Sequence, residues 1–247
     1  MTFTDMKVLF FGGCLLTTKT VARDKRFVNV LQAGNPELEI ELARYASFSL
    51  VKEIFEAQFK VHAPDVIVFL IRPFPFYILS KLFPRVPGLK GGNEFKMHPG
   101  LLNKQEWFTE NDRLIVEMDW NPNGTKRTIT HSINLKLGKI LGLEKWAIRH
   151  VKNTLLELSE ACRKRSIRLI VVSPPAVQND PVERALLVNL NLDIIKSFEN
   201  YIDLFSGDFS DNMLGPDKVH YNDAGHSLLA KKIEEKLFTL HASAAAR

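Results

Sequence analysis

The sequence is 247 residues long, with 45% hydrophobic residues, 25% charged residues and a formal net charge of +5. This composition is typical of a globular protein and excludes a disordered, fibrous, collagen-like or disulfide-stapled chain. The stretch 126–168 holds 11 Lys and Arg residues against three Asp and Glu, so the rest of the chain is slightly acidic. Because the positive charge is local, we expect no nucleic-acid partner.

Short apolar segments alternate along the chain with longer segments of helical periodicity. Strands are predicted at residues 7–11, 38–43, 65–71, 168–172 and 201–205, and helices at 21–32, 48–62, 145–164, 181–200 and 223–240. In the clearest helix, apolar residues share one stripe: Ala147, Val151, Leu155, Leu158 and Cys162. The third predicted strand is apolar at nearly every position, as in strands covered on both faces. This alternation predicts a parallel sheet with helices on both sides.

Residues 72–144 do not follow this alternation of strand and helix patterns. They hold six of the twelve prolines, the pair Gly91-Gly92 and a turn sequence at residues 120–124. No linker-like tract flanks them, so we expect a partly helical insertion packed on the same domain. The chain is therefore predicted to be a single domain over residues 1–247, with a frayed tail at residues 242–247.

Neither a signal peptide nor a transmembrane segment is visible. The longest uninterrupted apolar run, residues 66–71, has six residues, far fewer than the about 20 that span a bilayer. We therefore expect a cytoplasmic protein in which Cys14 and Cys162, the only cysteines, are reduced. Cys162 lies on an apolar helical stripe and is expected to be a buried packing residue.

The most specific motif precedes the last predicted helix and reads Asp217-Lys218-Val219-His220. A carboxylate three residues before a histidine can accept a hydrogen bond from one imidazole nitrogen and leave the other to act as a general base. The alternative is an Asp and a His that only occupy a turn. A metal site of Asp217, His220, Asp223 and His226 is disfavoured because no second cluster has ligand spacing. Phosphate-loop motifs are absent too, so we expect no metal and no cofactor.

The motif extends to Asn222 and to Gly225-His226, and in this form it resembles the last conserved block of the SGNH (GDSL-type) hydrolase superfamily. The resemblance covers the chain apart from the insertion after strand three. It implies an α/β fold, a three-layer α/β/α sandwich of flavodoxin-like type with a central five-stranded parallel sheet. In that family the nucleophile is the serine of a Gly-Asp-Ser motif after the first strand.

Here the first strand is followed by Gly12-Gly13-Cys14, so a thiol occupies the nucleophile position. The resemblance implies a triad of Cys14, His220 and Asp217. A thiol near an imidazole and a helix N-terminus is a strong nucleophile. The alternative is that Cys14 is an inert replacement of the serine.

The resemblance also indicates which groups stabilise an oxyanion or bind substrate. Gly13 belongs to the nucleophile block, and Ser47 stands nearest to the family's Gly after strand two, where a backbone donor survives. The Asn after strand three is missing, and Arg72 stands near its place as a cationic donor, a substrate anion site or an ordinary surface residue. Because parallel strands end at one edge of the sheet, these residues are predicted to share one rim with Cys14 and His220.

Three functions remain open from the sequence. The favoured one is a hydrolase of carboxylic esters or thioesters that forms a covalent acyl-enzyme on Cys14, because Asp217 and His220 are suited to move a proton. The others are an acyltransferase at the same site and a binding protein that keeps the fold without the chemistry. The expected partner is a small-molecule or acylated substrate, and the apolar residues 73–79 either line its pocket or form the core of the insertion.

Overall fold

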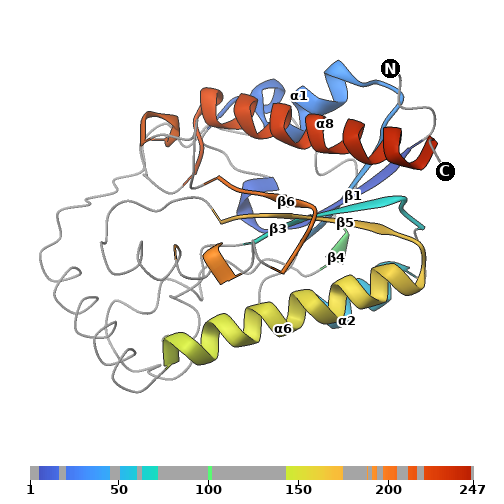
Figure 1. Ribbon diagram of the computed structural model, residues 1–247. Coiled ribbons are helices and arrows are strands. Elements are labelled where there is room, and N and C mark those ends of the chain that lie inside the picture. Colours follow the sequence, from blue (N-terminus) through green and yellow to red (C-terminus); the bar gives the residue numbers. More distant parts are fainter. Residues whose placement is uncertain are drawn as a thin grey trace, which may run out of the picture.

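The computed structural model describes residues 6–16, 21–44, 51–59, 63–71, 100–101, 143–174, 188, 191–193, 197–204, 211–215 and 220–245. These residues form a six-stranded sheet in the order β4-β2-β1-β3-β5-β6 (Figure 1). The strands are β1 (Lys7–Gly12), β2 (Glu39–Arg44), β3 (Val66–Leu70), β4 (Gly100–Leu101), β5 (Arg168–Val172) and β6 (Tyr201–Ile202).

Five of these strands are parallel, in the order β2-β1-β3-β5-β6. This is the flavodoxin-like order, and it confirms the predicted parallel sheet. The strand order reverses at β1, which pairs with β2 on one side and with β3 on the other. Ligands of such sheets bind beyond the carboxyl ends of the strands near this reversal.

The prediction missed the sixth strand, β4. It pairs antiparallel with β2, with Leu101 opposite Ala43 and Gly100 opposite Arg44. Only two residues take part, so no alternating pattern was available to recognise it. The stretch interpreted as an insertion therefore contributes an edge strand to the central sheet.

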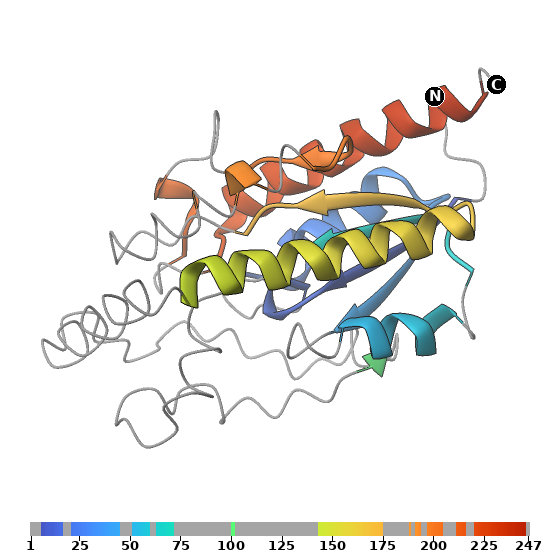
Figure 2. The ribbon, with the colours of Figure 1, turned by 60° about the horizontal axis from the view of Figure 1, so that its bottom comes forward.

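Helices cover both faces of the sheet and complete the predicted three layers (Figures 1 and 2). Helices α1 (Phe27–Gly34) and α8 (Asp223–Ala245) lie on one face, and α2 (Val51–Phe59) and α6 (Leu143–Lys164) on the other. The described residues also form the short 3₁₀ helices η1 (Cys14–Leu16), η2 (Arg23–Lys25) and η5 (Asp211–Met213). Among the described residues, no helix is long and apolar enough to cross a membrane.

The sheet separates two apolar clusters. Phe10 and Val68 point toward α1 and α8, where they pack with residues such as Leu31, whereas Leu9 and Phe69 point toward α2 and α6. Every residue of β3 is buried, which explains why its sequence is apolar without alternation. On α6, the predicted stripe is buried at Val151, Leu155, Leu158 and Cys162.

The boundaries of three predicted helices need correction. The helix predicted at 21–32 begins only at Phe27, because Arg26 has an extended backbone (φ −67°, ψ 138°), and it ends at Gly34. The helix predicted at 181–200 does not reach its predicted end, since residues 197–200 form a turn and bends. The last helix continues to Ala245, so most of the tail predicted to be frayed, 242–247, is helical; its alanines are the best helix formers.

Candidate active site at the carboxyl ends of the strands

Cys14 stands at the carboxyl end of the central strand. Strand β1 ends at Gly12, and after Gly13 the chain turns into η1, where the Leu16 N–H donates to the Gly13 carbonyl at 3.2 Å. A Cβ on Gly12 would lie 3.1 Å from Leu70 Cδ1 and 3.2 Å from Leu16 Cγ. A glycine at position 12 thus lets η1 fold back tightly over β3, and it places the Cys14 backbone directly beyond the strand.

His220 is held by a short antiparallel ladder just before α8. Leu214 and Tyr221 form an isolated bridge, and the Gly215 N–H donates to the His220 carbonyl at 2.6 Å. The Asn222 N–H donates to the Met213 carbonyl at 3.0 Å. The residue is half-buried, and its Nε2 atom is fully buried. The carbonyl of the predicted general base and the two residues that follow it are therefore held in place.

Asn222 explains why an amide stands two residues after this histidine. Its Oδ1 accepts from the Gly225 N–H at 3.1 Å, which caps the first turn of α8. Its Nδ2 donates to the Asn212 carbonyl at 2.6 Å. One side chain thus joins η5 to the start of α8. The spacing Asn-x-x-Gly ahead of an apolar helix was a capping signal that sequence reasoning left unused.

His226 is a buried, neutral histidine in the first turns of α8. Its side chain has no exposed surface, and its Nδ1 accepts from the Phe27 N–H at 3.2 Å. Its pKa is lowered to about 3, first by burial and then by the charges of His220 and Arg26. The sequence predicts only that His226 lies in the final helix. Its hydrogen bond with Phe27 of α1 could not be predicted, because the two residues are 199 positions apart.

The residues that adjoin Cys14 and His220 pack in the same apolar cluster. Leu15 and Leu16, which follow Cys14, belong to it, as do Leu214 and Tyr221, which flank His220 in the ladder. Figure 1 shows η1 and the start of α8 at the same end of the sheet, where the parallel strands end. The segments that carry these two predicted site residues therefore lie at the same end of the sheet.

Several predicted site residues cannot be compared with the structure. Asp217, Ser47 and Arg72 lie outside the described residues, as does the side chain of Cys14. Gly13 is described and buried at the junction of β1 and η1. The triad and the oxyanion donors therefore stay predictions.

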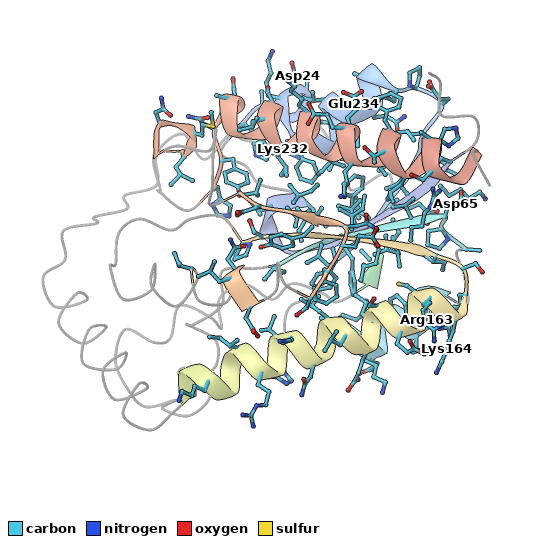
Figure 3. The ribbon with its side chains drawn as sticks, in the orientation of Figure 1. Asp24, Asp65, Arg163, Lys164, Lys232 and Glu234 are labelled. Atoms are coloured by element: carbon cyan, nitrogen blue, oxygen red, sulfur yellow. The ribbon has the colours of Figure 1, made fainter. Side chains whose placement is uncertain are left out.

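The basic end of α6 lies away from this rim. Arg163 donates to Glu160 at 2.8 Å, Lys164 lies 3.7 Å from the same carboxylate, and Arg165 pairs with Glu56 at 3.0 Å. Figure 3 shows Arg163 and Lys164 at the end of the molecule near Asp65, where the strands begin. Local acidic partners and a helix C-terminus account for these cations, as expected for a solvated helix end.

The fold was compared with known proteins. Neither a family model nor a curated protein matches this sequence. Among solved structures, the psychrotrophic esterase EstA from Pseudoalteromonas sp., inhibited by monoethylphosphonate, matches with a TM-score of 0.54 and 10% identity, covering 96% of this chain and 100% of that one. The chain has an SGNH-hydrolase-like fold.

Two further structures agree with this likeness. The acetylxylan esterase Axe2 from Geobacillus stearothermophilus matches with a TM-score of 0.52 and 16% identity, covering 94% of each chain. A member of the lipolytic G-D-S-L family from Veillonella parvula matches with a TM-score of 0.51 and 13% identity, covering 93% of this chain and 97% of that one. The likeness thus extends over nearly the whole of each chain.

Proposed function

We propose that this protein hydrolyses carboxylic esters or thioesters, with acetyl or other acyl groups, through Cys14, His220 and Asp217. The observation that carries the proposal is the position of two backbone segments. Residue 14 stands two positions after the central strand, and residue 220 stands three positions before α8, at the same end of the sheet. The fold around them is shared with proteins described as esterases and lipases.

The proposed chemistry begins with a proton transfer. Asp217 accepts a hydrogen bond from one nitrogen of the His220 imidazole, and the other nitrogen takes the proton of the Cys14 thiol. The thiolate attacks the ester carbonyl, and the backbone N–H groups of Gly13 and Ser47, with Arg72, stabilise the oxyanion. His220 then protonates the leaving alcohol or thiol. Water, deprotonated by the same imidazole, hydrolyses the thioester on Cys14 and restores the free thiol.

The first experiment compares the wild type with His220→Ala and Cys14→Ala on p-nitrophenyl acetate and on a medium-chain p-nitrophenyl ester. Each substitution is expected to reduce kcat/KM by about 100-fold or more, because each removes a proton acceptor or a nucleophile. His241→Ala is the matched control, since this histidine lies in α8 near the end of the helix that is farther from His220. Its rate is expected to equal that of the wild type.

The outcomes separate the parts of the proposal. Equal rates in the wild type and His220→Ala would show that the protein is not this kind of enzyme. Full activity in Cys14→Ala beside an inactive His220→Ala would remove the nucleophile assignment alone. Cys14→Ser is expected to keep part of the activity, because an alanine in place of serine is described as a catalytic mutation in the Geobacillus esterase.

A further inference from the structure

Four buried aromatic rings connect the central strand with the residue beside His220. Phe10 on β1 contacts Phe27 on α1 edge to face, with ring centroids 5.6 Å apart. The ring of Phe27 is stacked on His226 of α8, at 5.9 Å and an interplanar angle of 6°. His226 in turn meets Tyr221 edge to face at 5.9 Å. None of the four side chains has exposed surface, so the row is rigidly packed.

His226 also completes the N-terminus of α1. The cap residue of this helix, Arg26, makes no side-chain hydrogen bond to the first turn. The first N–H groups of a helix lack partners within the helix, and a buried one is costly when it finds none. The Nδ1 of His226 accepts from the Phe27 N–H at 3.2 Å and so replaces the missing cap from another element. This bond leaves the ring proton on Nε2.

The Nε2 atom of His226 is buried and has no hydrogen-bond partner among the described residues. A buried donor without a partner costs stability, so such a group needs an explanation. Phenylalanine would fill the same space without this cost but would lose the bond to α1. The histidine is thus a compromise that favours a fixed geometry between α1 and α8 over maximal stability.

We propose that His226 is a positioning residue of the candidate active site, which aligns the segment bearing His220 with the elements that follow Cys14. The inference rests on the proposed function, because the alignment matters for proton transfer. Tyr221 is the residue that follows His220, and its ring contacts that of His226. His226 accepts a hydrogen bond from the Phe27 N–H of α1, the helix that follows η1 and η2. A displacement of about 1 Å in such a site costs on the order of 100-fold in rate.

Two substitutions separate the ring of His226 from its hydrogen bond. His226→Phe keeps the stack on Phe27 and removes the acceptor, whereas His226→Asn removes the ring and places an amide oxygen near the position of Nδ1. With a chromogenic ester, His226→Phe is expected to lower kcat about 10- to 100-fold at an unchanged KM. His226→Asn is expected to recover part of this loss.

A second readout does not depend on activity. In protein with ¹⁵N-labelled histidine, the imidazole signals of His220 are followed against pH in the wild type and both variants. His226→Phe is expected to move the signals and the titration midpoint of His220, and His226→Asn to move them less. Phe27→Leu, which keeps the backbone donor and shortens the row by one ring, is expected to give an intermediate change and tests the same coupling without altering His226.

The outcomes distinguish this inference from the proposed function. If the wild type shows no His220-dependent hydrolysis, the enzyme proposal fails, and the histidine signals still test the positioning. If the variants keep both the kcat and the His220 signals of the wild type, His226 is only a packing residue and the inference is overturned. If His226→Phe does not fold, His226→Asn and Phe27→Leu test the inference instead. Wild-type His220 signals in both of these variants would overturn it.

Discussion

Gly225 shows how closely the elements around His220 approach one another. A Cβ at this position would lie 2.5 Å from the Met213 carbonyl oxygen and 2.9 Å from Tyr221 Cβ. Both neighbours are held in the ladder that precedes α8, so neither can move without displacing it. The glycine in the sequence motif is therefore required by packing, and together with Asn222 it fixes where His220 stands above the sheet.

The buried imidazole of His226 is expected to make the free energy of unfolding depend on pH. Its pKa is about 3 in the folded protein and about 6.5 in an unfolded chain, so between these values only the unfolded state binds the proton. Above pH 6.5 this imidazole does not lower the free energy of unfolding. As the pH decreases from 6.5 toward 3, it lowers the free energy of unfolding by up to about 1.4 kcal/mol per pH unit. His220 and Arg26 are the charged groups that add to this shift.

The measurement is urea unfolding at pH 7 and pH 4.5 for the wild type and His226→Phe. Both proteins lose stability on acidification through their other groups. The wild type is expected to lose about 2–3 kcal/mol more, because only it carries the titrating imidazole. Equal losses would show that His226 is accessible to protons in the folded state.

The five parallel strands could be predicted from the sequence, and so could the end of α6 and the start of α8, whereas the start of α1 could not. β5 was predicted at its observed bounds and β1 to within one residue, because a change from apolar to polar residues marks where a short buried strand ends. The start of α1 depends instead on His226, which is 199 positions away. The end of α6 was predicted at its observed position, Lys164, because it depends on a local turn: Ser166 adopts a φ of 58°, and the Ile167 N–H donates to the Cys162 carbonyl at 2.9 Å.

Some features of the candidate site could likewise be predicted from the sequence, and others could not. The sequence was sufficient to predict that Cys14 follows the first strand and that His220 precedes the last helix, since both are local features of the chain. It could not predict that His226 joins α8 to α1 or that Asn222 joins α8 to η5, because these are contacts between elements. The mutual geometry of Cys14, His220 and Asp217 stays a prediction for the same reason.

Asn222 allows a test of how η5 is attached to α8. Asn222→Ala removes the cap of α8, worth about 1 kcal/mol, and the hydrogen bond to the Asn212 carbonyl, worth about another 1 kcal/mol. The expected loss of unfolding free energy in urea is therefore about 2 kcal/mol. Asn222→Ser, which keeps a capping oxygen and lacks the amide donor, is expected to lose about half as much. Equal losses in the two variants would show that the cap contributes nothing.

At the scale of the whole molecule, the sheet keeps the candidate site and the second cysteine apart. The segments around Cys14 and His220 pack with the apolar cluster between the sheet and helices α1 and α8. Cys162 belongs to the cluster on the opposite face, where α6 covers the sheet. The segment that carries Cys14 and the helix that carries Cys162 therefore pack on opposite faces of the sheet, so labelling of the two cysteines tests different parts of the structure.

Cys162 should become reactive only when the whole domain unfolds. Its side chain is 1% exposed, and burial raises its pKa to about 12, so it is almost never a thiolate at pH 8. In Cys14→Ala, the aromatic disulfide reagent of Ellman is expected to label Cys162 at least about 1,000-fold more slowly in buffer than in 6 M guanidinium chloride, since a stable domain is unfolded in less than about one part in a thousand. The wild type, in which Cys14 is the proposed nucleophile, is expected to show one additional thiol that reacts without denaturant. Rapid labelling of Cys162 in buffer would instead show that α6 opens locally from the sheet, because that helix is the layer that covers this thiol.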